Sequence, residues 1–233
     1  TAKFGFHDSE KILQLFCAET LFLFSPACTR IQNAVYFYIS FYKQKGQLMK
    51  LKTRIAVIIC KVSGALLRKM GRGGTNLPGK LALKIDKNIL GELSQSVKVT
   101  VVTGTNGKTT TSRMIEQAFS DAGFRYFSNK SGANLLTGII AVFAQYCSLS
   151  GKCRYTHALI ECDEAAFRKA SEFLPVECLV VNNIFRDQLD RYGEITHTLN
   201  AIREGITHIP DAVLCLNADC SLTASLAEKI PNR

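Results

Sequence analysis

A short run of glycine, lysine and threonine is the part of the sequence best suited to chemistry. It reads Gly-Thr-Asn-Gly-Lys-Thr-Thr over residues 104–110. Glycines let backbone amides approach an anion closely, and Lys108 adds a positive charge for a β- or γ-phosphate. The hydroxyl of Thr109 stands where such a loop offers a ligand to Mg²⁺. The predicted phosphate contacts come from Gly104, Thr105, Asn106, Gly107, Lys108, Thr109 and Thr110.

The run is shorter than the usual phosphate-binding loop. That loop reads Gly-x-x-x-x-Gly-Lys-[Ser/Thr], and its first glycine would fall at Val102. A tight turn between a strand and a helix is therefore the alternative interpretation. The flanking sequence favours phosphate binding, because an apolar strand-like run precedes the loop and a helix-like stretch ending near Gly123 follows it. Such a helix points free backbone amides and a positive dipole end at the loop.

Strand-like and helix-like segments alternate from Val97 onwards, and they must position this loop. Short buried strands between helices predict an α/β fold, with a mostly parallel sheet and helices on both faces. Ligands in such folds bind at the carboxyl ends of the strands, where the loop lies. The strand-like runs are 97–103, 124–128 (the weakest), 157–162, 176–182 and 212–217, and the helix-like stretches lie near 108–122, 134–148, 164–173, 194–208 and 221–229.

Four stretches carry a resemblance to a known family. "VTGTNGKTTT" resembles the ATP loop of Mur ligases and folylpolyglutamate synthases. With "NKSGANLLTGI", "ALIECDEAAF" and "NNIFRDQLDRYGE" it is similar to the MurT family of lipid II isoglutaminyl synthase subunits, over roughly residues 49–233. The resemblance implies a P-loop central domain of the Mur ligase type over 97–233, incomplete at its C-terminal end, that binds ATP and Mg²⁺.

The resemblance also assigns roles to individual residues. It implies that Lys108 and Glu161 are catalytic, and that Glu161 and Thr109 hold Mg²⁺ through oxygen atoms, which this hard cation prefers. Asn183 and Asp187 are expected to contribute to nucleotide binding. The relatives also carry a four-cysteine zinc ribbon, which is expected only beyond Arg233.

Other interpretations of these residues stay open. Glu161 would also suit a cap on the helix that follows it, and Asp187, Asp190 and Arg191 would also suit a structural network of ion pairs. Gln188 stands where Mur ligases have a histidine, which argues against ligation of a second metal ion at that point. In "LNADCS" a cysteine and a serine replace the Asp-Pro of the corresponding Mur ligase turn.

The implied reaction is the amidation of a carboxylate. ATP would convert the D-glutamate α-carboxylate of lipid II into an acyl phosphate, and ammonia would convert that to D-isoglutamine. Nothing in the chain resembles a glutaminase nucleophile site, so a GatD-type glutaminase is the expected partner. One alternative is another Mur-type or folylpolyglutamate-synthase-like amide ligase, although no UDP-binding domain of usual size precedes Val97. Another is a fragment that binds ATP or a partner without activity alone.

The positive charge of the chain is concentrated in one segment. Residues 43–87 hold twelve Lys and Arg against one acid, whereas the whole chain has 29 Lys and Arg against 19 Asp and Glu. The rest of the chain is therefore nearly neutral. Such a segment suits lipid headgroups or a pyrophosphate, although a merely solvated basic face is the usual alternative. We expect a cytoplasmic protein at the inner face of the membrane, and no nucleic-acid partner.

Residues 49–96 form a separate region in this interpretation. A basic amphipathic helix over 53–70 would lie on a membrane surface or pack against the rest of the protein. A glycine-rich connector follows at 71–80. Residues 1–48 are predicted to be an atypical extension upstream of a start at Met49.

Neither the cysteines nor the histidines form a recognisable constellation. The nine cysteines include no Cys-x-x-Cys pair, and buried free thiols are the preferred interpretation. Zinc binding through residues 147 and 153, or 215 and 220, is a weaker alternative. The four histidines receive no chemical role.

Overall fold

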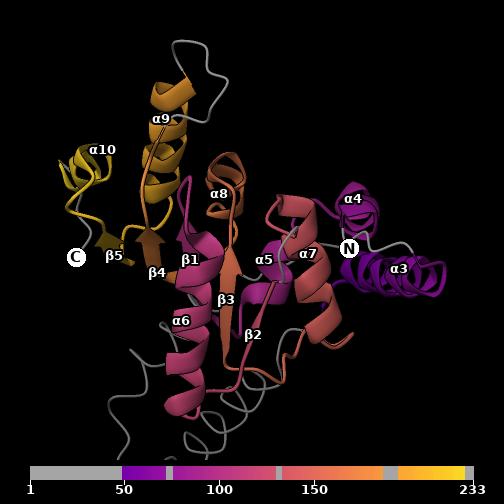
Figure 1. Cartoon of the computed structure of the whole chain (residues 1–233). Helices are drawn as coiled ribbons and strands as arrows, with labels where there is room; N and C mark the ends of the chain where they lie inside the picture. Colours follow the sequence, from indigo (N-terminus) through magenta and orange to yellow (C-terminus); the bar gives the residue numbers. More distant parts are fainter. Residues whose placement is uncertain (1–48, 72–75, 130–132, 186–193, 229–233) are drawn as a thin grey trace, which may run out of the picture. The chain divides into compact units, whose positions relative to one another are not determined.

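Five parallel strands form the centre of the protein (Figure 1). The structure is a computed structural model and describes residues 49–71, 76–129, 133–185 and 194–228. The predicted extension over 1–48 lies outside these residues. The strand order is β2-β3-β1-β4-β5, so the strand before the phosphate loop lies in the middle of the sheet. The strands are β1 (Lys98–Thr103), β2 (Tyr126–Ser128), β3 (His157–Glu161), β4 (Val176–Val181) and β5 (Val213–Leu216).

The helices fall close to the stretches predicted after each strand. Alternation of strand and helix thus gives the expected α/β fold, and the predicted mostly parallel sheet is confirmed. The helices are α3 (Leu51–Lys69), α4 (Asn76–Ile85), α5 (Ile89–Ser94), α6 (Lys108–Asp121), α7 (Leu136–Tyr146), α8 (Glu164–Ala170), α9 (Glu194–Thr207) and α10 (Ser221–Ala224), with a 3₁₀ turn at Ser225–Ala227.

Helices cover the two faces of the sheet unequally. Helix α6 packs on β1 and β3, in front of the sheet in Figure 1, and buries only Ser112. The main core contains alternate residues of the strands together with large side chains from α7, α8 and α9. Fully buried members of this core include Val99, Val101, Ile160, Leu179, Phe143, Phe167 and Ile202.

Two cysteines are less buried than the sequence predicts. All seven described cysteines are free thiols, and Cys60, Cys147, Cys162 and Cys220 are buried as predicted. Cys215, however, is exposed, and Cys178 is only half-buried. An apolar run in these two strands therefore does not imply burial on both faces of the sheet.

The helices before β1 belong to the same core as the sheet. Helices α3, α4 and α5 all pack against α7. Residues 76–80, which the sequence assigns to a connector, instead begin α4, with Pro78 in the first turn where its missing N–H does no harm. The carboxylate of Asp86 accepts a 2.5 Å hydrogen bond from the buried hydroxyl of Thr53 and so ties the end of α4 to α3.

Within the described residues, no helix is both long enough and apolar enough to span a membrane.

Candidate nucleotide-binding site

The predicted loop joins the end of β1 to the start of α6, in a conformation that needs its glycines. Gly104 has a φ of 122° and Gly107 a φ of 80°, the region that residues with a side chain rarely adopt. A Cβ atom on Gly104 would lie 2.8 Å from the carbonyl oxygen of Asn183. The backbone can therefore pass this close to β4 only without a side chain at that position.

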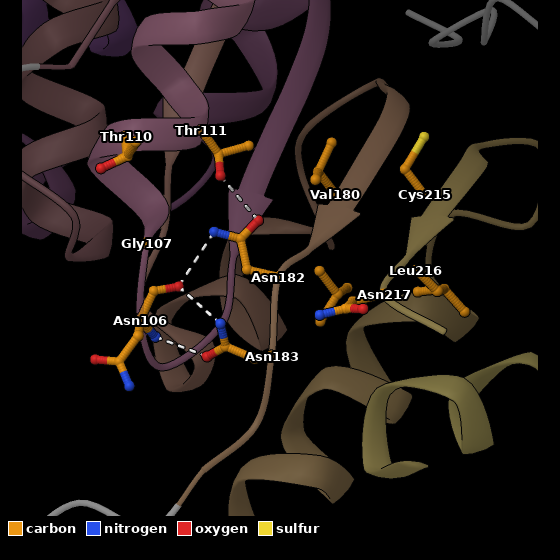
Figure 2. A pocket seen from close by; sticks show the side chains of 11 residues that line it. Asn106, Gly107, Thr110, Thr111, Val180, Asn182, Asn183, Cys215, Leu216 and Asn217 are labelled. Atoms are coloured by element: carbon orange, nitrogen blue, oxygen red, sulfur yellow. Dashed lines mark hydrogen bonds between the residues drawn. The ribbon is translucent and has the colours of Figure 1, made fainter. Parts of the chain in front are cut away.

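Two asparagines at the end of β4 hold the loop in place (Figure 2). Asn183 accepts a 2.9 Å hydrogen bond from the N–H of Asn106 through its side chain, and another of 2.9 Å from the N–H of Thr105 through its carbonyl. The side-chain amides of Asn182 and Asn183 each donate to the carbonyl of Asn106 at 3.2 Å. Asn182 also accepts from the Thr111 hydroxyl at 3.2 Å. Asn183 was among the predicted residues, and Asn182 was not.

Lys108 is the first residue of α6, and its side chain folds back over the loop. Its Nζ donates to the carbonyl of Gly104 and, at 3.3 Å, to that of Thr105. It also lies 3.8 Å from Oε1 of Glu164, and both side chains are mostly buried. The cation is thus held at the mouth of the loop, where it would meet a phosphate.

The other predicted pair meets across two neighbouring strands. The hydroxyl of Thr109 donates a 3.0 Å hydrogen bond to Oε2 of Glu161. Glu161 ends β3 and pairs in register with Val102 of β1, which brings its carboxylate to the loop. The alternative role as a helix cap belongs to Asp163 instead, because its side chain accepts from the N–H of Ala165 at 3.1 Å.

Asn129 fixes the strand end that carries Glu161. Its side chain accepts a 2.7 Å hydrogen bond from the N–H of Glu161 and donates a 2.7 Å bond to the same residue's carbonyl. It also donates to the carbonyl of Ala133 at 3.0 Å, and it is 3% exposed. The sequence predicts no role for Asn129, although the residue lies in one of the stretches that carry the family resemblance.

This donor set fits Mg²⁺. Thr109 and Glu161 present adjacent oxygen atoms beside a loop built for phosphate. Mg²⁺ is usually bound by one or two protein groups, with phosphate oxygens and waters completing its shell. In the part of the chain that the structure describes, no cluster of three or more His, Cys, Asp or Glu side chains suggests a further metal site.

A pocket of roughly 610 Å³ opens beside the loop (Figure 2). One side is the start of α6, with Gly107 and Thr110, and the other is the carboxyl ends of β4 and β5. The size falls within the range of small-molecule sites, and the lining combines apolar side chains with a few amides. The residues on this wall come from the ends of the two strands and the positions directly after them: Val180, Val181, Asn182, Asn183, Cys215, Leu216 and Asn217.

Some predicted residues are not tested by this geometry. Asp187, Gln188, Asp190 and Arg191 lie outside the described residues.

Burial raises the pKa of the Cys162 thiol, which follows Glu161, so this cysteine stays protonated beside the site.

Comparisons with known proteins identify the family to which this chain is similar. The sequence profile of the Mur ligase middle domain matches residues 102–233. The chain is 40% identical over 174 residues to the lipid II isoglutaminyl synthase (glutamine-hydrolyzing) subunit MurT of Streptococcus pneumoniae strain R6, covering 75% of this chain and 38% of that protein. It is 36% identical over 165 residues to the MurT subunit of Staphylococcus aureus strain COL, covering 70% and 37%. The chain therefore spans less than two fifths of the length of these relatives.

Solved structures resemble the fold at lower sequence identity. MurF from Acinetobacter baumannii matches with a TM-score of 0.53 and 22% identity, covering 64% of this chain and 32% of that one. MurF ligase from Thermotoga maritima, solved in complex with ADP, matches with a TM-score of 0.51 and 18% identity, covering 64% and 34%.

Proposed function

Because the chain belongs to the Mur ligase family, we propose that it carries the ATP-binding part of an amide ligase that activates a carboxylate. The observation that supports this most directly is the 3.0 Å contact between Thr109 and Glu161, next to Lys108 at the glycine loop. A loop of this kind binds the phosphates of ATP, and the paired oxygens suit Mg²⁺.

The pocket between α6 and the ends of β4 and β5 would receive the rest of the nucleotide. Its apolar wall at Val180 and Leu216 suits the face of a base, and the amides of Asn182 and Asn217 suit polar edges. Glu161 and Thr109 would hold Mg²⁺, which, when bound, lowers the charge on the phosphate oxygens.

The substrate we propose is lipid II, with the D-glutamate α-carboxylate as the reacting group. A carboxylate oxygen attacks the γ-phosphorus, the bond from that phosphorus to the β,γ-bridging oxygen breaks, and ADP leaves. Lys108 is positioned to offset the negative charge that spreads over the transferred group. Both MurT relatives are named as subunits of lipid II isoglutaminyl synthase.

Ammonia completes the reaction in this proposal. Its lone pair attacks the carbonyl carbon of the acyl phosphate, phosphate leaves, and the surplus proton passes to the phosphate. The relatives are named as subunits of a glutamine-hydrolyzing synthase, so the partner we propose is a GatD-type glutaminase that supplies the ammonia. We place the reaction in the cytoplasm, at the inner face of the membrane.

Trapping of the acyl phosphate tests the proposal. The protein that carries this chain, combined with a glutaminase subunit, lipid II, ATP and Mg²⁺, should form D-isoglutamine, read by mass spectrometry of the stem peptide. With hydroxylamine in place of glutamine, it should form a hydroxamate at the same carboxylate. Lys108→Ala and Glu161→Gln should each lower both products by about a hundredfold or more, because each removes charge stabilisation in the transition state.

Glu177→Gln provides the matched control. Glu177 is an exposed carboxylate on β4 that pairs with Lys98 at 3.1 Å, away from the loop. The activity of the Glu177→Gln variant should equal that of the wild type. Addition of an amino acid to the substrate without ammonia transfer would contradict the proposal and point to another Mur-type ligase.

A further inference from the structure

Helix α3 exposes an unusual amount of apolar surface. Large apolar side chains that face solvent recur along one side of this helix, from its first residue to the residue that ends it. Elsewhere in the described chain such side chains are scattered over different elements. The stripe consists of Leu51, Ile55, Ile58, Val62, Leu66 and Met70, with exposed fractions between 43% and 73%.

The opposite side of α3 is the one that packs on the protein. Its buried residues are Thr53, Ala56, Val57 and Cys60, of which only Val57 has a branched apolar chain. The sequence pattern over 53–70 places the larger apolar side chains on one face of the helix, and in the structure this face is exposed to solvent. The helix is therefore apolar on two sides, and only one of them is covered in the described structure.

Positive charge surrounds the stripe. Helix α3 contains five Lys and Arg residues and no Asp or Glu. On a helical projection Lys52 lies on one side of the stripe and Arg54 on the other, with Lys69 at its C-terminal end. Long basic side chains can keep their charge in a headgroup layer while their stems lie along apolar surface.

The nearby acids do not cancel this charge. Asp86 is 7% exposed and bonded to Thr53, and Glu92 is already paired with Lys50 at 3.1 Å. A helix with apolar residues on one side and a cationic border fits the interface of an anionic bilayer. The helix has 19 residues, and it lies along a surface rather than across it, because no described helix is suited to span a membrane.

From these observations we propose that the outer face of α3 docks on an anionic phospholipid bilayer. The stripe would enter the boundary between headgroups and acyl chains, and Lys52 and Lys69 would meet lipid phosphates. The biological purpose of this docking rests on the proposed function, because a lipid-linked substrate would lie at such a surface. The binding itself needs neither ATP nor substrate.

Vesicle co-sedimentation tests the docking separately from catalysis. The full chain is mixed with vesicles of phosphatidylcholine and phosphatidylglycerol in equal amounts, without nucleotide. The wild type should sediment with these vesicles, and less with phosphatidylcholine alone or at high salt. The double variant Ile58→Ser and Val62→Ser should lower the partition coefficient by about tenfold or more, because two apolar side chains no longer enter the bilayer.

Two further variants separate the electrostatic contribution to vesicle binding from the apolar contribution. Lys52→Gln with Lys69→Gln should lower binding to anionic vesicles by about tenfold and leave the weak binding to neutral vesicles unchanged. Met114→Ser is the matched control, because Met114 is 70% exposed but lies on α6, which packs on β1 and β3. It should bind like the wild type.

Two results would overturn the proposal. One is equal vesicle binding by the wild type and the double serine variant. The other is a self-associating wild type whose dimer, measured by sedimentation velocity without vesicles, is broken by the serine variant; the stripe would then be a contact between copies. Loss of lipid II amidation with vesicle binding intact would contradict the proposed function and leave the docking surface standing.

Discussion

Glu161 gains its place in the site from residues that are far away in the sequence. Its carboxylate contacts Thr109, 52 positions earlier, and its backbone is bonded on both sides to the amide of Asn129, 32 positions earlier. A carboxylate intended for Mg²⁺ must be held at a fixed distance from the phosphate loop. Groups that orient a metal ligand without touching the metal commonly affect its affinity by about 10- to 100-fold.

Asn129→Ala should therefore lower the apparent affinity of the enzyme for Mg²⁺ without unfolding the protein. The Mg²⁺ concentration that gives half-maximal activity should rise by about tenfold, since the strand end carrying Glu161 loses two hydrogen bonds. Ser128→Ala is the control, because the Ser128 hydroxyl bonds to Glu116 and not to Glu161. The same half-maximal concentration in wild type and Asn129→Ala, with unchanged circular dichroism, would contradict this role.

At the scale of elements, the helices before β1 depend on one very close approach. A Cβ atom built on Gly79 of α4 would lie 1.7 Å from the carbonyl oxygen of Thr137 in α7. The two helices can touch along their backbones only because this residue has no side chain. Glycine here is thus a packing requirement, whereas a glycine inside a helix normally lowers stability.

Two glycine substitutions in neighbouring helices should have opposite effects. Gly79→Ala should lower the free energy of unfolding by about 1–3 kcal/mol or more, because α4 must move away from α7. Gly64→Ala in α3 should raise it by about 0.5–1 kcal/mol, since its Cβ would meet nothing nearer than 3.6 Å. Urea denaturation gives both values, and a neutral Gly79→Ala would mean that the helices do not pack this closely.

At the scale of the whole molecule, the site joins strands from both halves of the sheet. The loop after β1 is bonded to the end of β4, and the pocket extends to β5. A nucleotide in the pocket would therefore contact α6, β4 and β5 together. Any ligand that binds the folded state alone stabilises it by mass action.

ATP with Mg²⁺ should raise the thermal midpoint of the protein. At a nucleotide concentration a hundred times the dissociation constant, binding adds about 2.7 kcal/mol to the free energy of unfolding. Lys108→Ala should keep the fold and lose most of this gain, because its side chain contacts the loop and not the core. Differential scanning fluorimetry with and without the nucleotide measures the difference. An undiminished shift in Lys108→Ala would exclude the loop as the phosphate site.

Several features of the protein follow from the sequence alone. The β-branched run before Gly104, the glycines of the loop and the helix-like stretch after it determine a strand, a turn and a helix by local preference. Alternation of such segments determines the parallel sheet, and the order of residues places Lys108 and Thr109 at its carboxyl edge. These features depend on neighbours within a few positions, so the pattern of residue types is sufficient to predict them.

Other features were decided only by the tertiary structure. Asn129, Asn182 and Glu164 act on residues that are distant in the chain, and which of them meet depends on strand order and register. The outward direction of the apolar face of α3 was also decided there, because small residues allow the other face to pack closely on α4 and α7. Periodicity measures how apolar each side of a helix is, but burial depends on which side the remaining elements can approach.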